Sequence, residues 1–251
     1  MQSSIHKAEM LSTLDLESAF YHIELETDSR DITTFVSRSG LYRFTRLVFG
    51  IKSAPELFQK TMTTIIGRIK GVITYLDDLL VFADSVEEHD RILALVIERL
   101  KMFNLKINEK KSVLRASSVH FLGFEISKQG VSLTQSKIKA FLDMRAPQTA
   151  SELRSLLGTA QFFGKFIENL SQRTHFMRQL LHKGAQFCWK QCHQKELDDL
   201  KTSVSSQTTL KYYDPHDKTY LITDADPNGL GAVLSQEEHE VFVLSYVFLE
   251  V

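Results

Sequence analysis

The stretch that decides the fold is VITYLDDLLVF, at residues 72–82. Two apolar runs of strand length flank its adjacent aspartates, Asp77 and Asp78, and both runs are rich in β-branched and aromatic residues. The segment therefore predicts a tight hairpin. Aspartates at a hairpin tip also fit an ordinary solvated turn, whereas buried carboxylates without partners are costly. On these residues alone, the two interpretations are evenly balanced.

A further acidic residue favours a functional site. Asp15 lies in LSTLDL (11–16), a short strand-like segment in which one carboxylate has apolar neighbours. If the two segments are neighbours in one sheet, Asp15 and Asp77 converge at one edge. Clustered carboxylates repel each other unless cations neutralise them, and Mg²⁺ prefers oxygen ligands. Two such ions, about 3.5–4 Å apart, can activate an attacking hydroxyl and stabilise a leaving phosphate oxygen, so the pattern indicates phosphoryl transfer.

Five motifs follow one another along the chain. They are STLDL (12–16), FGIKSAP (49–55) with Phe58 and Gln59 after it, YLDD (75–78), NEKK (108–111) and FLGF (121–124). Each motif is weak alone, but together, in this order and spacing, they resemble the reverse transcriptase of gypsy-type LTR retrotransposons, which is related to the retroviral enzymes. The resemblance covers nearly the whole chain. It implies an α+β fold: a right-hand polymerase palm with its fingers largely missing, a helical thumb and connection, and the opening strands of an RNase H-like domain.

The resemblance implies an RNA-directed DNA polymerase, with an RNA or DNA template, a DNA primer and dNTPs as its partners. Two Mg²⁺ ions, or Mn²⁺ in their place, would be held by Asp15 and Asp77, with Asp78 in support and the backbone carbonyl of Leu16 contributing. The primer 3′-hydroxyl would attack the α-phosphate of the dNTP. Lys111 would donate a proton to the departing pyrophosphate, although a solvated lysine fits the sequence nearly as well.

The same resemblance assigns residues around the nucleotide and the primer. Phe20 would lie under the sugar and exclude a 2′-hydroxyl; without the motif, a core aromatic would be the favoured interpretation. Phe49 and Gly50 would line the nucleotide pocket. The primer grip would be formed by Phe121, Leu122 and Gly123.

Three regions follow from the resemblance: a palm with residual fingers at 1–128, a thumb and connection at 129–205, and a truncated RNase H-like domain at 206–251. YLITDAD (220–226) and GLGAVL (229–234) resemble the opening hairpin of that domain. Asp224 matches its first metal-binding acid, now vestigial. The other acids of this fold would come after Val251, and one aspartate cannot hold two ions. We therefore expect no RNase H activity.

Hydrophobic patterning predicts the elements. Strands are expected at 11–16, 33–37 and 41–47, and a hairpin at 119–133 that turns at 129–130. Helices are expected at 54–70, from the capping boxes SVEE (85–88) and TASE (149–152) to about residues 104 and 169, and at 174–183 and 191–205.

Charge and composition fit an intracellular protein with a basic surface. The net charge is −1, but residues 128–183 hold nine Lys or Arg against three acids. This segment suits a phosphate-contacting surface, and a solvated helical face fits equally well. No apolar run is long enough to span a membrane, and no signal peptide is evident. We expect the cytoplasm, within virus-like particles, with the nucleus as a second compartment.

Three hypotheses stay open. Only 14 residues precede Asp15, so the basic groups that clamp the triphosphate in the family's fingers have no counterpart, and both ends of the chain look truncated. The chain is an active reverse transcriptase domain, a catalytically defective truncated remnant that binds nucleic acid without polymerising, or a relic with no nucleic-acid role. Salt-dependent binding to a primer–template would exclude the relic. The oligomeric state is left open.

Overall fold

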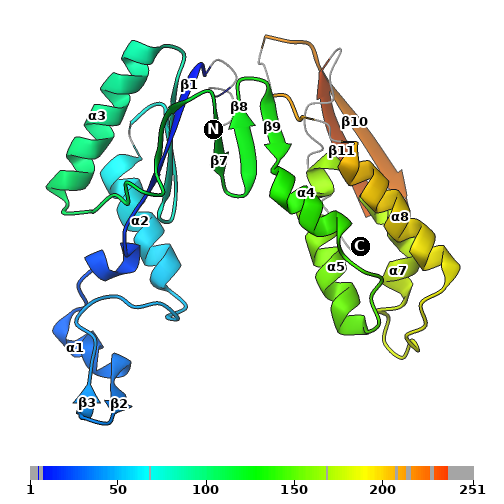
Figure 1. Ribbon diagram of the computed structural model, residues 1–251, viewed down its shortest axis with the longest axis horizontal. Coiled ribbons are helices and arrows are strands. Elements are labelled where there is room, and N and C mark those ends of the chain that lie inside the picture. Colours follow the sequence, from blue (N-terminus) through cyan, green and yellow to red (C-terminus); the bar gives the residue numbers. More distant parts are fainter. Residues whose placement is uncertain are drawn as a thin grey trace. The chain divides into compact units, whose positions relative to one another are not determined.

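The computed structural model describes residue 5 and residues 8–67, 69–167, 169–206, 209–212, 216–226 and 229–236 (Figure 1). The chain divides into two compact units. We call Lys7–Leu122 the palm unit, and Gly123–Val251 together with Met1–His6 the helical unit. Each unit contains its own hydrophobic core, and the two are described separately below.

The palm unit is built on a four-stranded antiparallel sheet in the order β4-β5-β1-β6. Its strands are β1 (Met10–Asp15), β4 (Val72–Tyr75), β5 (Asp78–Ala83) and β6 (Val113–Ala116). β1 pairs with β5 on one side and with β6 on the other. The hairpin predicted at 72–82 and the strand predicted at 11–16 are therefore confirmed, and they are neighbours. A further short strand, β7 (Ser118–Phe121), follows β6.

Two amphipathic helices supply the core that covers this sheet. They are α2 (Ala54–Ile66) and α3 (Val86–Met102), and each buries one apolar face, including Phe58 and Met62 of α2 and Val96 and Leu100 of α3. Pro55 opens α2 in its first turn, where a missing backbone N–H costs little. The Ser85 hydroxyl accepts a hydrogen bond from the Glu88 N–H and caps α3, as the sequence predicts.

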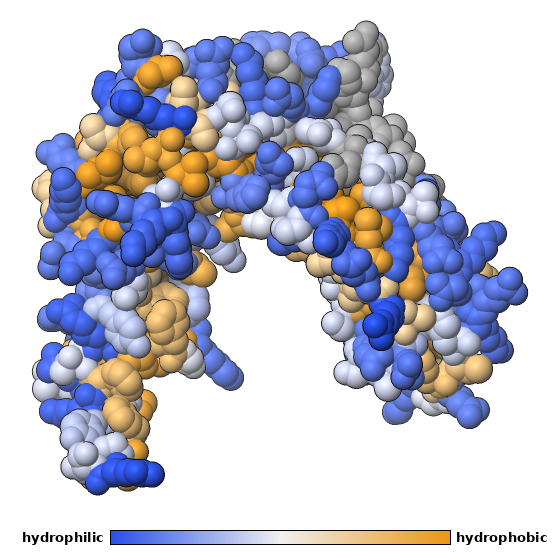
Figure 2. Space-filling model, viewed as in Figure 1, coloured by the Kyte–Doolittle hydropathy of each residue, from blue (hydrophilic) through white to orange (hydrophobic). Residues whose placement is uncertain are grey.

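The segment between β1 and α2 contains little regular structure. It holds η2 (Ala19–His22), α1 (Thr27–Arg30), η3 (Asp31–Thr33) and a short hairpin of β2 (Phe35–Ser37) and β3 (Gly40–Tyr42). The strands predicted at 33–37 and 41–47 are shorter than expected. After Tyr42 the ladder ends, because the Phe44 N–H donates to the Thr33 hydroxyl at 3.0 Å. Figure 2 shows hydrophobic side chains on the surface of this hairpin, and Ile32, Val36 and Leu41 are strongly exposed.

The helical unit begins with a hairpin and continues as packed helices. The hairpin is β8 (Phe124–Ser127) and β9 (Gly130–Leu133), which turns at 128–129. The helices are α4 (Gln135–Leu142), α5 (Ala150–Phe162), η4 (Gly164–Phe166), α6 (Leu170–Arg173), α7 (His175–Gln179) and α8 (Gln191–Ser205). Their inward faces form one core that includes Phe141, Phe163 and Leu200. The Glu196 carboxylate of α8 accepts the Phe176 and Met177 N–H groups, both at 2.8 Å, and fixes α7.

Two helical predictions in this unit need correction, and one helix was not predicted. The helix that begins at Ala150 ends at Phe162 rather than near residue 169, because the chain passes into a 3-10 turn and Asn169 adopts a left-handed backbone with φ 52°. The helix predicted at 174–183 is only α7. The sequence analysis did not predict α4. The helix at 191–205 is confirmed as α8.

The last described elements are β10 (Thr219–Asp226) and β11 (Gly229–Gln236), which pair antiparallel. This confirms the hairpin predicted at 220–226 and 229–234. In the described parts of the chain, no helix is long and apolar enough to cross a lipid bilayer.

Candidate active site

The sheet of the palm unit brings the three predicted aspartates to one end of two adjacent strands. Asp15 is the last residue of β1, and its partner across the ladder to β5 is Asp78. The Leu16 N–H donates to the carbonyl oxygen of Asp77 at 3.0 Å. Asp77 is exposed, whereas Asp15 and Asp78 are partly buried. The convergence of Asp15 with Asp77 that the sequence analysis expected is therefore present in the fold.

These carboxylates form an unbalanced negative site. Burial raises the pKa of Asp78, and the charges of Asp77 and Asp15 raise it further, while Lys111 acts in the opposite direction. The Lys111 Nζ lies 3.6 Å from the Asp15 Oδ2, and the lysine side chain is largely exposed. A single exposed ammonium cannot neutralise three carboxylates, so a cation placed between them would be stabilised.

The hairpin tip that carries Asp77 is held by a side chain from α2. Leu76 has a φ of 51°, a left-handed conformation that costs a non-glycine residue roughly 1–2 kcal/mol. The Gln59 Oε1 accepts the Leu76 N–H at 2.7 Å, and the Gln59 Nε2 donates to the Thr74 carbonyl at 3.3 Å. The side-chain amide of Gln59 thus bridges β4 and the strained turn. The sequence analysis quoted Gln59 as part of a motif but assigned it no role.

An aromatic cluster lies where the nucleotide pocket was predicted. The ring centroids of Phe20 and Phe49 are 4.9 Å apart in an edge-on arrangement. The Phe20 ring also packs against the fully buried Phe58, with their centroids 5.5 Å apart. Phe49 is 63% exposed. Phe20 therefore packs on the core on one side and against an exposed ring on the other. Gly50 has a φ of 91°, a conformation that L side chains rarely adopt, so its backbone requires glycine.

The predicted primer-grip residues lie at the boundary of the two units. Phe121 is buried and ends β7, and Leu122 follows it with a φ of 51°. Gly123, with a φ of 80°, begins the helical unit. This positive φ favours glycine at position 123, whereas a Cβ there would meet only the mobile end of the Lys137 side chain. Asp224 lies on β10 opposite Gly231 of β11; only its backbone is described.

The donor set of the palm site consists of oxygen atoms, as Mg²⁺ prefers. Leu16, the buried residue that follows Asp15, places a backbone carbonyl at the same strand end. Among the described residues, no group of three or more His, Cys, Asp or Glu side chains is arranged to hold a metal ion. The carboxylates of Asp15, Asp77 and Asp78 at this strand end fit a hard divalent cation in their chemistry.

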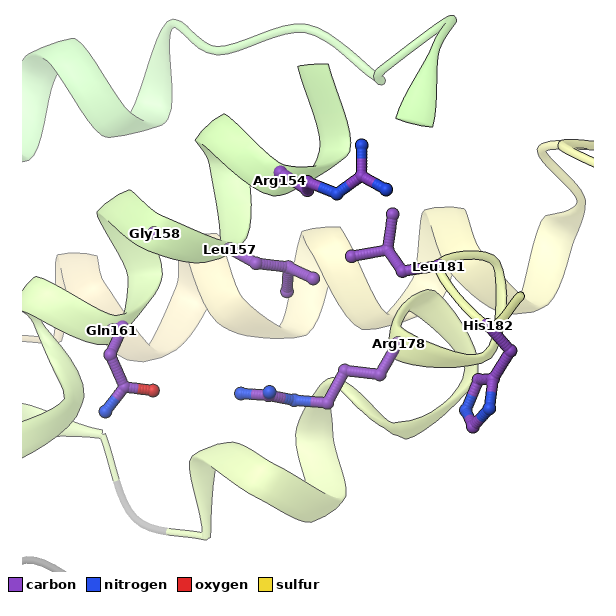
Figure 3. A pocket seen from close by; sticks show the side chains of 7 residues that line it. All are labelled: Arg154, Leu157, Gly158, Gln161, Arg178, Leu181 and His182. Atoms are coloured by element: carbon purple, nitrogen blue, oxygen red, sulfur yellow. The ribbon is translucent and has the colours of Figure 1, made fainter. Parts of the chain in front are cut away.

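A basic cavity lies on the helical unit, within the positively charged segment noted in the sequence. It has a volume of about 450 Å³ and is lined by Arg154, Leu157, Gly158, Gln161, Arg178, Leu181 and His182 (Figure 3). The Arg178 Nε donates to the Thr174 hydroxyl at 2.9 Å, while Arg154 and Arg178 form no ion pair with any described carboxylate. Two guanidinium groups over a leucine floor form a surface that suits phosphate groups.

Comparison with known proteins places the chain in a family. A family model described as reverse transcriptase (RNA-dependent DNA polymerase) matches residues 1–126. This chain belongs to the reverse transcriptase family. A second family model, described as the RNase H-like domain found in reverse transcriptase, matches residues 189–247. That match includes α8, which the sequence analysis assigned to the thumb and connection.

Relatives of this reverse transcriptase chain occur in transposon polyproteins. The Transposon Tf2-3 and Tf2-7 polyproteins of Schizosaccharomyces pombe are each 32% identical to it over 240 residues, which is 95% of this chain and 18% of each polyprotein. The chain thus spans about a fifth of the length of these relatives. The predicted resemblance to retrotransposon reverse transcriptases is confirmed.

Solved structures give the same result for the fold. The foamy viral protease-reverse transcriptase dRH in complex with double-stranded DNA has a TM-score of 0.85 and 26% identity, covering 97% of this chain and 44% of that one. The foamy viral protease-reverse transcriptase in complex with an RNA/DNA hybrid has a TM-score of 0.83 and 25% identity, covering 96% of this chain and 34% of that one. The predicted α+β polymerase fold is confirmed.

Proposed function

We propose that this chain is the polymerase part of a retrotransposon polyprotein and adds nucleotides from dNTPs to the 3′-hydroxyl of a DNA primer on an RNA or DNA template. The observation that carries the proposal is the meeting of Asp15 with Asp77 and Asp78 at neighbouring strand ends, in a chain of the reverse transcriptase family. The reaction consumes dNTPs, so we propose that it takes place inside the cell.

The acidic strand end would hold two Mg²⁺ ions. Asp15 and Asp77 are their main ligands in this proposal, the Leu16 carbonyl adds an oxygen, and Asp78 supports the pair from a partly buried position. When bound, the metal ions supply Lewis-acid activation of the primer hydroxyl and charge stabilisation of the phosphate oxygens. Mn²⁺, which also accepts oxygen ligands, can serve in the same site.

Lys111 would act on the leaving group. Its ammonium is exposed and lies 3.6 Å from the Asp15 carboxylate, so it stands at the edge of the proposed metal site. A lysine there can hold a proton at its Nζ and donate it to the departing pyrophosphate. The long side chain lets it leave Asp15 when the triphosphate arrives.

The aromatic cluster and the turn after β7 would orient the two reactants. Phe20, fixed against Phe58, would support the sugar and exclude a 2′-hydroxyl, while Phe49 and Gly50 line the same pocket. The primer terminus would be held by Phe121, Leu122 and Gly123. The basic cavity of the helical unit would contact template or primer phosphates, which is in keeping with the nucleic acids bound in the two foamy viral complexes.

The test is primer extension on an RNA template with a DNA primer, in Mg²⁺, by the wild type and two variants. We expect Asp77→Asn to lower the rate by at least about a thousandfold, since a metal ligand and its charge are lost. The matched control is Asp84→Asn, which removes an exposed carboxylate just after β5 and should extend normally. EDTA should stop extension, and added Mg²⁺ should restore it.

Two outcomes would contradict the proposal. Equal extension by the wild type and Asp77→Asn would exclude this carboxylate from the reaction. If the wild type extends nothing but binds the primer–template with an affinity that falls steeply with salt, the chain is a nucleic-acid-binding protein and not a polymerase.

A further inference from the structure

On the side of β1 that faces β6, the backbone of Asp15 is held by a loop rather than by a strand. β6 pairs with β1 only from Leu11 to Thr13, and the register shifts between these positions. Beyond Thr13 no strand residue of β6 remains to bond Asp15. Its N–H instead donates to the Ser112 hydroxyl at 3.2 Å, and its carbonyl accepts the Asn108 N–H at 2.8 Å. The loop thus replaces the ladder at the residue that carries the proposed metal ligand.

The hydroxyl of Ser112 makes two hydrogen bonds at once. It accepts the Asp15 N–H, and it donates to the Asn108 carbonyl at 2.8 Å. That carbonyl also accepts the backbone N–H groups of Lys111 and Ser112, at 3.2 and 3.1 Å. We call this set, formed by Asn108, Ser112 and the backbone of Asp15, the Ser112 clasp. Only a side chain that both donates and accepts can complete it.

The clasp fixes Asp15 relative to the hairpin and to Lys111. On the other side of the strand end, the Leu16 N–H donates to the Asp77 carbonyl at 3.0 Å. The end of β1 is therefore hydrogen-bonded to the loop on one side and to the hairpin on the other. Lys111 precedes Ser112 directly, and its ammonium reaches the Asp15 carboxylate. A shift of this loop would therefore displace a carboxylate and a cation of the site together.

We propose that Ser112 is a positioning residue of this active site: its hydroxyl fixes the backbone of Asp15 and thereby holds the Asp15 carboxylate beside Asp77 and Asp78. The inference rests on the proposed function, because it takes Asp15 as a ligand of the reacting centre. Small displacements of reacting groups are costly, and a shift of about 1 Å can lower a rate by about a hundredfold.

The test compares Ser112→Ala, Ser112→Thr and Ser117→Ala. The alanine variant removes both hydrogen bonds, whereas threonine keeps the hydroxyl. Ser112 lines a cavity of about 730 Å³ with Leu14 and Ile107, so the extra methyl of threonine has room. Ser117 is exposed, lies after the far end of β6, and is the matched control.

In primer extension with a Mg²⁺ titration, Ser112→Ala should lower kcat by about tenfold or more, the effect of losing a hydrogen bond that positions a catalytic group. It should also raise the Mg²⁺ concentration for half-maximal rate, because its Asp15 is no longer pre-positioned. The KM for dNTP and the primer–template Kd should change by less than about twofold. Ser112→Thr should restore the wild-type values, and Ser117→Ala should have them throughout.

A second readout does not depend on activity. Hydrogen exchange of the Asp15 amide, followed by NMR in the metal-free protein, should be faster in Ser112→Ala than in the wild type or Ser112→Thr. Mn²⁺ binding, followed by EPR, should be weaker in Ser112→Ala alone. These two measurements separate the two proposals. If the wild type extends no primer, but Ser112→Ala still shows faster exchange and weaker Mn²⁺ binding than the wild type, the polymerase function is rejected and the positioning of Asp15 is retained.

Two results would overturn the inference. One is an alanine variant with the kcat, Mg²⁺ dependence and Asp15 exchange of the wild type, which would make the clasp dispensable. The other is a threonine variant as impaired as alanine, with a lower Tm in both, which would show that Ser112 acts through packing and not through its hydroxyl.

Discussion

Asp78 is the residue at which the electrostatic cost of the site is concentrated. Its pKa lies above the ordinary value of 3.8 because of burial and the neighbouring charges of Asp77 and Asp15. The Asp78 carboxyl group therefore binds its proton more tightly in the folded state than in the unfolded state. The stability that the proton contributes is full below the unfolded pKa and is lost as the pH rises through the folded pKa. At neutral pH, the ionised Asp78 opposes folding.

Replacing Asp78 by asparagine should therefore stabilise the protein near pH 7. The gain in Tm should grow as the pH rises from about 3 to 7. Added Mg²⁺ should raise the Tm of the wild type more than that of Asp78→Asn, since a bound cation relieves the same repulsion. Thermal melts at several pH values, with and without Mg²⁺, measure both effects. If Asp78→Asn is less stable than the wild type at pH 7, the ionised Asp78 carboxylate does not oppose folding and this prediction is wrong.

A second prediction at this scale concerns Phe20. Phe20→Val should raise the use of rNTPs relative to dNTPs by about tenfold or more, because the smaller side chain no longer excludes a 2′-hydroxyl. It should also lower the free energy of unfolding by about 1–3 kcal/mol, since contact with Phe58 is lost. The matched control is Tyr21→Val, which removes a more exposed ring from Phe49. Unchanged rNTP discrimination in Phe20→Val would assign Phe20 to the core alone.

At the scale of elements, a buried polar network ties α3 to β1 and β6. Ser12 and His89 are both fully buried, and the Ser12 Oγ and His89 Nε2 are hydrogen-bonded at 2.9 Å. The Arg115 N–H donates to the same serine at 2.9 Å, and the Arg115 guanidinium binds Asp90 through two hydrogen bonds. Arg115 has a φ of 52°. The network therefore stabilises an unfavourable backbone conformation at Arg115, in β6, the strand that follows the clasp.

His89→Ala should destabilise the palm unit by about 2–4 kcal/mol, because it creates a cavity and leaves a buried serine without one of its partners. The control is His120→Ala, which truncates an exposed histidine of β7 and should cost less than about 0.5 kcal/mol. Urea denaturation followed by far-UV circular dichroism gives both values. Similar costs for the two variants would mean that the network contributes nothing to stability.

How far these elements follow from the sequence depends on how local their causes are. The caps at Ser85 and Thr149 act within three residues, and the sequence predicts both. Helix α4 buries only Ile138 and Phe141, which is too weak a periodicity to recognise. The Ser112 clasp joins residues that are 97 positions apart, and nothing in the local pattern of Ser112 indicates Asp15 as its partner. The family motifs identified the acidic residues but not the bonds that hold them.

At the scale of the molecule, the acidic strand end belongs to the palm unit and the basic cavity to the helical unit. A net charge near zero thus conceals a separation of charge, as residues 128–183 predict. Phosphate contacts release counterions, so each contact contributes to the salt dependence of binding. The charge of the segment suggested its role from sequence, but only the fold shows that Arg154 and Arg178 line the same cavity.

The double variant Arg154→Ala, Arg178→Ala should bind a primer–template more weakly, with a slope of log Kd against log salt that is reduced by about 1–2. The matched control is Lys195→Ala on α8, which removes an exposed charge outside the cavity and should keep the wild-type slope. Fluorescence anisotropy over a range of salt concentrations measures these slopes. A double variant with the slope of the wild type would exclude the cavity from phosphate binding.

The two separate hydrophobic cores also determine which unit tryptophan fluorescence reports on. The only tryptophan of the chain, Trp189, packs against the core of the helical unit and donates from its indole to Gln194 at 3.2 Å. Indole emission therefore reports on the helical unit. Unfolding confined to the palm unit would leave the emission spectrum of Trp189 unchanged. A ligand that stabilises only the acidic strand end would leave a tryptophan-detected melting curve where it was, and a screen read at that wavelength would discard it as a non-binder.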